Sequence, residues 1–140
     1  MRVVIDTDVM VAALESASGA SRALLLSILD GKAVLVCSTP LFFEYEAVLT
    51  RPQVLQRAGV TSVDVREFLD ELASLCVPVG FDFRWRPVAD DPDDDLVIET
   101  AVNGMADAIA TFNIKDIRAG AENFGIIACR PVEVLRRITR

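Results

Sequence analysis

Short apolar runs rich in β-branched residues alternate with helix-like segments along the whole chain. Val3-Val4-Ile5 belongs to the first run, at residues 2–5, and four similar runs follow at residues 34–37, 76–79, 108–111 and 126–129. A short continuous run of this kind is typical of a strand buried in a parallel sheet. Strands that alternate with helices predict a parallel sheet with helices on both faces. We therefore expect an α/β fold.

Helix start and stop signals divide the segments between these runs. Thr39-Pro40 is an N-cap followed by proline, the segment 61–64 has a capping-box pattern, and Gly31 and Gly59 are stop signals. Together with apolar spacing, such signals predict helices at residues 9–15, 21–30, 39–49, 52–58, 61–75, 96–103 and 131–138. With no repeat or linker, we expect a single domain over residues 1–140.

The charge balance limits the possible partners and chemistry. A net charge of −7 argues against general nucleic-acid affinity, but five aspartates lie between residues 90 and 95, so much of this charge is local. Twelve of the fourteen basic residues are arginine, which suits bidentate phosphate contacts. The chain has no histidine, so hydrolysis would require carboxylates, a metal-activated water or a Ser/Cys nucleophile.

The apolar segments favour a cytoplasmic protein without a membrane span. The longest apolar runs, such as residues 23–26, are far shorter than a membrane-spanning helix. Asp6 and Asp8 interrupt any signal-peptide core at the N-terminus. Cys37, Cys76 and Cys129 are widely spaced in apolar stretches, so we expect buried thiols and no metal binding by them.

An acid stands where the first predicted strand ends. Asp6 follows Ile5, and ligands of open α/β sheets bind beyond the carboxyl ends of strands. Asp6 could instead cap the helix expected from Val9. Because Asp8 is better placed for that cap, we interpret Asp6 as a site residue.

A second acid lies within the helix predicted at residues 39–49. Glu44 falls on the predicted buried stripe with Leu41 and Val48, whereas Glu46 faces the opposite side and is expected to be solvated. A carboxylate on a buried stripe is costly unless a cation or metal pairs with it. Glu44 is therefore the second candidate ligand.

The aspartates of residues 90–95 precede the helix predicted at 96–103. They could form a solvated acidic loop, and Asp93 and Asp94 would suit a helix N-terminus. Asp95 directly precedes the apolar helix, at the mouth of the sheet. A divalent cation would relieve the repulsion among so many carboxylates. We therefore take Asp95 as the third ligand and Asp94 as a weaker candidate.

More oxygen donors follow the predicted strand 108–111. Asn113 and Asp116 could be ordinary turn residues, but their place at the same ligand-binding edge favours a site. Thr7 and Thr111 could orient a carboxylate or a water through their hydroxyl groups.

These segments together resemble the PIN domain family, in the group of toxins from toxin–antitoxin pairs. The resemblance covers essentially the whole chain. It implies a Rossmann-like three-layer α/β/α sandwich around a mostly parallel sheet of about five strands, and a Mg²⁺- or Mn²⁺-dependent ribonuclease. The segments that carry it are Val4-Ile5-Asp6-Thr7-Asp8-Val9, Ser38-Thr39-Pro40-Leu41-Phe42-Phe43-Glu44-Tyr45, Asp91-Pro92-Asp93-Asp94-Asp95, Gly104-Met105-Ala106-Asp107 and Thr111-Phe112-Asn113-Ile114-Lys115-Asp116-Ile117.

The resemblance assigns the family's first three acids to Asp6, Glu44 and Asp95. At the fourth acidic position this chain has the neutral Asn113, and Asp116 could substitute three residues later. Where the family usually has Asn, two residues after the first acid, this chain has Asp8. The implied catalytic residues are therefore Asp6, Glu44, Asp95 and Asp116, with Asn113 as a further metal ligand and Thr7, Asp8 and Thr111 in support.

The implied reaction is hydrolysis of RNA by a metal-activated water, with one or two metal ions. The resemblance also implies an antitoxin protein as a partner and a homodimer. The apolar residues Phe81, Phe83 and Trp85 lend modest support to association. RNA-backbone contacts are conceivable for three arginines, although a structural or solvated role is favoured for each: Arg51, Arg57 and Arg84.

Two other functions are compatible with the sequence. Asp6 could be the nucleophile of a haloacid-dehalogenase-like phosphatase, whose phosphate-binding lysine would have to be Lys32 or Lys115. Alternatively, the neutral Asn113 could mark a catalytically inert PIN-like binding module.

Overall fold

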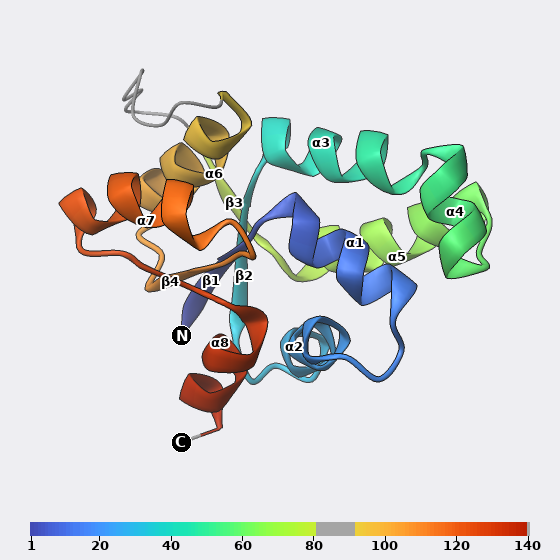
Figure 1. The fold of residues 1–140 in the computed structure, drawn as a ribbon, viewed down its shortest axis with the longest axis horizontal. Coiled ribbons are helices and arrows are strands. Elements are labelled where there is room, and N and C mark those ends of the chain that lie inside the picture. The colour runs from blue at the N-terminus through green and yellow to red at the C-terminus, as the bar shows by residue number, and fades with distance from the viewer. Residues whose placement is uncertain (81–91, 140) are drawn as a thin grey trace.

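Strands and helices alternate along the chain, as the sequence predicts (Figure 1). The computed structural model describes residues 1–80 and 92–139, with the side chains of all of these except 92–95. The strands are β1 (Arg2–Ile5), β2 (Val34–Ser38), β3 (Val77–Val79), β4 (Ala108–Ala110) and β5 (Ile127–Cys129). The helices are α1 (Thr7–Glu15), α2 (Ala20–Leu29), α3 (Thr39–Leu49), α4 (Pro52–Ala58), α5 (Ser62–Leu75), α6 (Pro92–Asn103), α7 (Ile114–Ala121), the 3₁₀ turn η1 (Glu122–Phe124) and α8 (Pro131–Ile138).

The five strands form one parallel sheet in the order β3-β2-β1-β4-β5. β1 is the central strand, with Val3 opposite Leu35 of β2 and Ala108 of β4. Val3, Val4 and Ile5 are fully buried, as expected for a strand covered on both faces. The predicted parallel sheet is confirmed.

The path of the chain through the sheet reverses beside β1. From β1 the chain runs to β2 and β3 on one side, and α6 then returns it to β4 on the other side of β1. In open α/β sheets a crevice forms at such a reversal, outside the carboxyl ends of the two strands. Asp6 and Thr111 directly follow β1 and β4, so the sequence places polar residues at this point.

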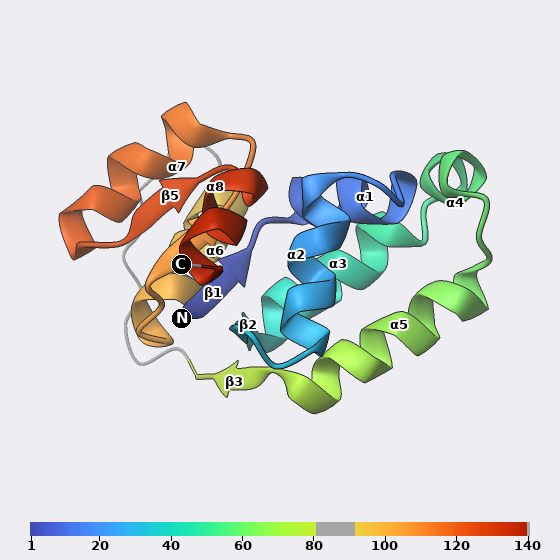
Figure 2. The ribbon, with the colours of Figure 1, turned by 90° about the horizontal axis from the view of Figure 1, so that it is seen from below.

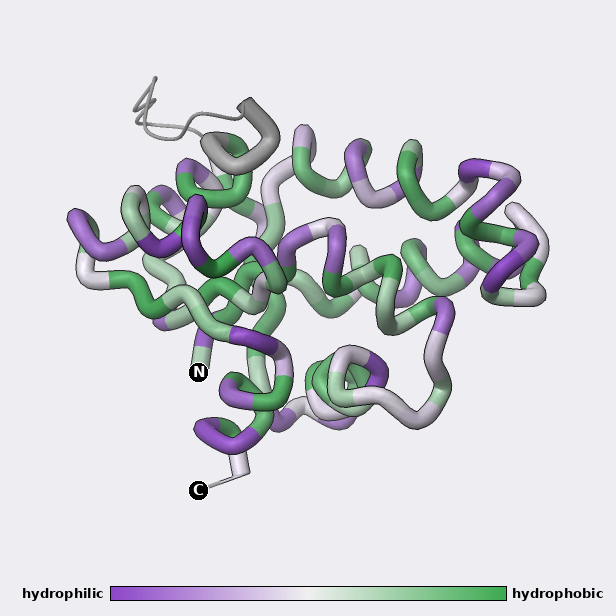
Figure 3. Tube along the Cα trace, viewed as in Figure 1, coloured by the Kyte–Doolittle hydropathy of each residue, from purple (hydrophilic) through white to green (hydrophobic). Residues whose placement is uncertain are grey.

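Helices cover both faces of the sheet. In Figure 2, α6 and α7 lie on one side, and α1, α2 and α5 lie on the other, while α8 packs against α2. Figure 3 shows that the central strands are largely hydrophobic, whereas α8 alternates hydrophobic and charged positions. Val134 of α8 is buried, and Arg136 and Arg137 are exposed. The three-layer α/β/α arrangement is therefore confirmed.

Several element boundaries differ from those predicted. α1 begins at Thr7 rather than Val9, which makes Asp6 its N-cap residue and moves Asp8 into the first turn. α6 begins at Pro92, four residues before the predicted start at Leu96. α7 was not predicted at all: its buried residues are Ile117 and the small Gly120 and Ala121, which give a weak apolar pattern.

Within the described part of the chain, no single helix is long and apolar enough to cross a membrane. α1 and α2 meet the criteria only when taken together, and their axes are bent by 100°.

Candidate functional site

Asp6 is fixed at the carboxyl end of β1 by hydrogen bonds from two directions. Its backbone N–H donates to the Ala110 carbonyl of β4 at 2.9 Å. Its carboxylate Oδ1 accepts from the Thr7 N–H at 2.8 Å, and Oδ2 accepts from the Thr111 hydroxyl at 2.7 Å. A negative charge at the N-cap of α1 is also stabilised by the helix dipole. Asp6 is thus both a cap, a role the sequence favoured for Asp8, and a side chain held at the crevice.

Thr7 joins this carboxylate to the acid of α3. Its hydroxyl donates to Glu44 Oε2 at 2.8 Å, and the Glu44 side chain is half-buried. Glu44, Thr7, Asp6 and Thr111 therefore form a continuous hydrogen-bonded chain across α3, β1 and β4, here called the acid–threonine chain. The structure brings together two of the three predicted acidic ligands and both predicted threonines.

The buried stripe of α3 differs from the predicted one. Leu41, Tyr45 and Leu49 are the buried residues, while Val48 and Glu46 are half-buried. Glu44 precedes Tyr45 and so lies at the border of this stripe rather than within it. This position lets Glu44 bond to Thr7 and still reach solvent.

Tyr45 lies beneath the acid–threonine chain and was not predicted as a site residue. It is fully buried, and its hydroxyl donates to the backbone carbonyl of Ile5, the residue before Asp6. Burial raises the pKa of Tyr45 well above its ordinary value, and the nearby Cys37, Asp6 and Glu44 raise it further. The phenol therefore stays protonated and donates a hydrogen bond that fixes the end of β1.

The segment after β4 contributes through its backbone. The fully buried Thr111 accepts from the Asn113 N–H at 2.9 Å, and the Phe112 N–H donates to Asp8 Oδ2 at 3.0 Å. Asn113 is the N-cap residue of α7 and is half-buried. Asp116 lies in the first turn of α7 with an exposed side chain, outside the acid–threonine chain.

Asp95 lies in the first turn of α6, but its side chain falls outside the described residues, as does that of Asp94. The orientation of the helix is nevertheless fixed. Arg2 donates from Nε and Nη2 to the carbonyl of Gly104, just beyond the end of α6, at 3.0 and 2.6 Å. Since Arg2 begins β1, the opposite end of α6 points toward the carboxyl edge of the sheet, where Asp6 lies.

A further polar contact holds α6 against the sheet, and the helix also buries an acid. The Ser38 and Thr100 hydroxyls are 2.8 Å apart and buried, and Ser38 also caps α3. Glu99 is fully buried one helical turn after Asp95 and was not predicted. The spacing of four residues from Asp95 is the sequence signal that could have found it, because such pairs share a helix face.

The cysteines do not provide a nucleophile. Cys37 and Cys129 are buried and Cys76 is half-buried, and all three are free thiols. Burial raises the pKa of Cys37 to about 12 and also raises the pKa values of Cys76 and Cys129. A reactive cysteine requires a thiolate near neutral pH, so these residues are structural. The prediction of buried thiols holds for two of the three.

The remaining site residues suit a hard divalent cation. The chain has no histidine, and Asp6 and Glu44 offer carboxylate oxygens, as Mg²⁺ and Mn²⁺ prefer. Among the described side chains, no three acidic, cysteine or histidine residues are grouped closely enough to hold a metal ion. The side chains of the predicted ligand Asp95 and the weaker candidate Asp94 lie outside that set.

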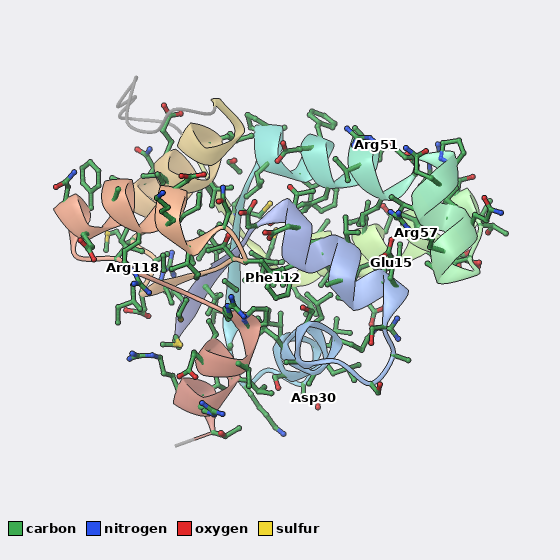
Figure 4. All side chains as sticks on the ribbon, in the orientation of Figure 1. Glu15, Asp30, Arg51, Arg57, Phe112 and Arg118 are labelled. Carbon is green, nitrogen blue, oxygen red and sulfur yellow. The ribbon has the colours of Figure 1, made fainter. Side chains whose placement is uncertain are left out.

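The predicted surface residues have mixed outcomes. Arg57 of α4 donates to Glu15 of α1 at 2.8 Å, which ties the two helices together, and both residues are visible in Figure 4. Arg51 is the exposed N-cap residue of α4. The other four candidates fall outside the described residues: Phe81, Phe83, Arg84 and Trp85.

A parallel five-stranded sheet with acids at its reversal point defines an α/β protein with an acidic site at the carboxyl edge. The chain matches the PIN domain family over residues 2–115 and belongs to that family. The match includes Asp6, Glu44, Asp95 and Asn113 and stops just before Asp116. Proteins with this domain are generally nucleases that use divalent metal ions. No match was found among curated proteins.

Proposed function

We propose that the protein is a Mg²⁺- or Mn²⁺-dependent ribonuclease that hydrolyses phosphodiester bonds at the carboxyl edge of the sheet. The acid–threonine chain carries this proposal, because it holds two carboxylates from distant parts of the sequence at the strand reversal. Family membership favours a nuclease over the phosphatase that the sequence also allowed.

Each member of the site has a distinct role in this proposal. Asp6, Glu44 and Asp95 would hold the metal, with Asn113 or Asp116 as a further oxygen donor. When bound, the divalent ion would supply electrostatic stabilisation at the attacked phosphate and activate a water as nucleophile.

Thr7 and Thr111 are positioning residues. Their hydroxyls donate to Glu44 and Asp6 and so fix the orientation of both carboxylates. The Asp6 carboxylate also lies at the N-cap of α1, where the helix dipole favours negative charge.

The test is RNA cleavage by the purified protein with Mn²⁺. We expect Asp6→Asn and Glu44→Gln to lower the cleavage rate by about a hundredfold or more, as for removal of groups that stabilise transition-state charge. Glu46→Gln, on the same helix, is the matched control and should cleave normally. The proposal is wrong if Asp6→Asn cleaves as fast as the parent. Intact RNA with the parent protein would favour an inert binding module.

The proposal extends to a toxin of a toxin–antitoxin pair, with an antitoxin protein as partner and a homodimer as the assembly. It rests on the resemblance of the sequence to that group of PIN domains. Expression of the parent should arrest growth, and expression of Asp6→Asn should not. A growth defect that is equal in both strains would argue against toxicity by RNA cleavage.

Light scattering would test the proposed homodimer. Co-purification with a small protein encoded next to this one would test the proposed antitoxin partner.

A further inference from the structure

A large apolar ring stands exposed beside the acid–threonine chain. Phe112 directly follows Thr111, and 44% of its surface is exposed. The hydrogen bond from its N–H to Asp8 Oδ2, 3.0 Å long, fixes the backbone at this position. Figure 4 shows Phe112 between α1 and α8. The backbone that carries the ring is therefore held in place, while part of the ring is accessible to a ligand.

Phe112 forms one wall of a groove of about 280 Å³. The start of α8 forms another wall, with Arg130, Pro131 and Val132, and the connection between α1 and α2 closes the third side. This volume lies near the lower end for ligand clefts, which suits one small planar group rather than a duplex. Phe112 in this wall directly follows Thr111, which belongs to the acid–threonine chain.

The charged side chain that lines the groove is positive, although the protein as a whole is acidic. Arg130 is exposed and lines it. The N-termini of α2 and α8 also open into it, and among the described residues neither N-cap, Gly19 or Arg130, closes its helix with a side-chain hydrogen bond. Helix N-termini carry partial positive charge and favour anions. An exposed aromatic ring next to such charge matches the chemistry of a nucleotide.

We propose that this groove binds one nucleotide of single-stranded RNA next to the cleaved bond. The base stacks on Phe112, and the backbone phosphate contacts the Arg130 guanidinium. Stacking on aromatic side chains and contacts to arginine are the usual means of binding single-stranded RNA. The inference rests on the proposed ribonuclease function, since it assigns part of the RNA substrate to this groove.

The experiment measures binding of a fluorescently labelled single-stranded oligoribonucleotide to the full chain in EDTA. Phe112→Ala should weaken binding about tenfold or more, because stacking on one aromatic ring contributes that much. Phe112→Trp should restore the affinity, a rescue that a merely structural role would not give. Arg130→Gln should weaken binding and make it less dependent on salt, as expected for loss of one phosphate contact.

Phe43→Ala is the matched control. Phe43 is 62% exposed on α3 and lies in a different groove, with Cys37 and Cys76. Its replacement should change affinity less than about twofold, in the range of surface substitutions. Equal affinities for Phe112→Ala and Phe43→Ala would overturn the inference, as would an absence of RNA binding by the parent. Thermal melting of each variant confirms that the fold is intact.

Cleavage assays with Mn²⁺ separate the two proposals. If the parent cleaves RNA and Phe112→Ala binds and cleaves as well as the parent, the groove assignment fails and the nuclease stands. If the parent binds RNA through Phe112 but never cleaves it, hydrolysis fails and the groove stands.

Discussion

Thr7 is the residue on which the geometry of the two acids depends, because it bonds to both. Thr7→Val keeps the side-chain shape but removes the hydrogen bond to Glu44 Oε2. A hydrogen bond to a charged group contributes about 1.5–3 kcal/mol, so we expect cleavage of RNA to slow by about tenfold or more. Thr50→Val, which removes a hydroxyl bond to the Glu46 carbonyl within α3, is the control and should leave the rate unchanged. Equal rates for the two variants would show that Thr7 does not position Glu44.

Tyr45 helps to position Asp6 through a hydrogen bond to the backbone of the preceding residue, Ile5. Tyr45→Phe leaves the ring in place and removes the bond to the Ile5 carbonyl. We expect the free energy of unfolding to fall by about 1 kcal/mol, measured by urea denaturation, because the lost partner was buried. The RNA cleavage rate should fall as well, since Asp6 follows Ile5. Unchanged stability would mean that the phenol contributes no net hydrogen-bond energy.

The sequence identified individual residues where their chemistry follows from position. Asp6 was found because it ends an apolar run, and Glu44 because it was placed on the buried stripe of its helix, although the structure shows it at the border of that stripe. Tyr45 was missed, since its partner is a backbone carbonyl and no spacing in the sequence indicates such a contact. Asp8 was assigned the helix cap because the start of α1 was placed two residues late.

The junction of α6 with the sheet depends on a residue without a side chain. A Cβ at Gly104 would lie 2.2 Å from Cγ1 of Val36 and 2.8 Å from Cγ2 of Val79. Gly104→Ala should therefore lower the free energy of unfolding by about 1–3 kcal/mol through overpacking. Gly80→Ala is the control, because a Cβ there meets nothing within 4 Å. Urea denaturation of both variants measures the difference, and equal stabilities would contradict the close packing.

The buried Cys37 thiol of β2 should make the free energy of unfolding sensitive to alkaline pH. Burial raises the pKa of Cys37 from 9.0 to about 12. The unfolded thiol loses its proton near pH 9 while the folded thiol keeps it, so the free energy of unfolding should fall as pH rises from 9 toward 12. Cys37→Val should show a shallower fall over this range. Identical pH dependence in parent and variant would exclude Cys37 as the cause.

Helices with clear capping signals and large apolar residues at helical spacing were recognised from the sequence, and helices without them were not. α5 carries a capping box, with reciprocal bonds between Thr61 and Asp64, and its start was found. α7 is short and buries small residues, so its segment was not recognised as a helix. Asn113 and Asp116 were interpreted as turn residues or as oxygen donors of the site. Asp116, which could be a turn residue by sequence, lies in the first turn of this helix with an exposed side chain.

At the scale of the whole molecule, metal binding should stabilise the folded chain. Carboxylates gathered at one edge repel each other, and a dication that binds only the folded state raises stability by mass action. With Mn²⁺ at a hundred times its dissociation constant, we expect the melting temperature to rise by roughly 5–10 °C. Asp6→Asn should lose this rise and Glu46→Gln should keep it. An equal rise in Asp6→Asn would place the metal elsewhere.

The sequence predicted a parallel sheet but could not order its strands. Alternation of strands and helices is a local pattern, whereas the pairing of β1 with both β2 and β4 depends on contacts between segments far apart in the chain. The meeting of Asp6 and Glu44 could be expected from the sheet edge alone. The bond between Asp6 and Thr111 could not, because it requires β1 and β4 to be neighbours.

That neighbour relation also sets an order of events during synthesis. β1 leaves the ribosome first, yet its second flanking strand is translated more than a hundred residues later, so the central strand stays half-paired until then. The Asp6 carboxylate acquires its Thr111 partner only after the whole segment from β1 to β4 has been made. A fragment that ends before β4 therefore lacks this hydrogen bond and cannot assemble the acid–threonine chain.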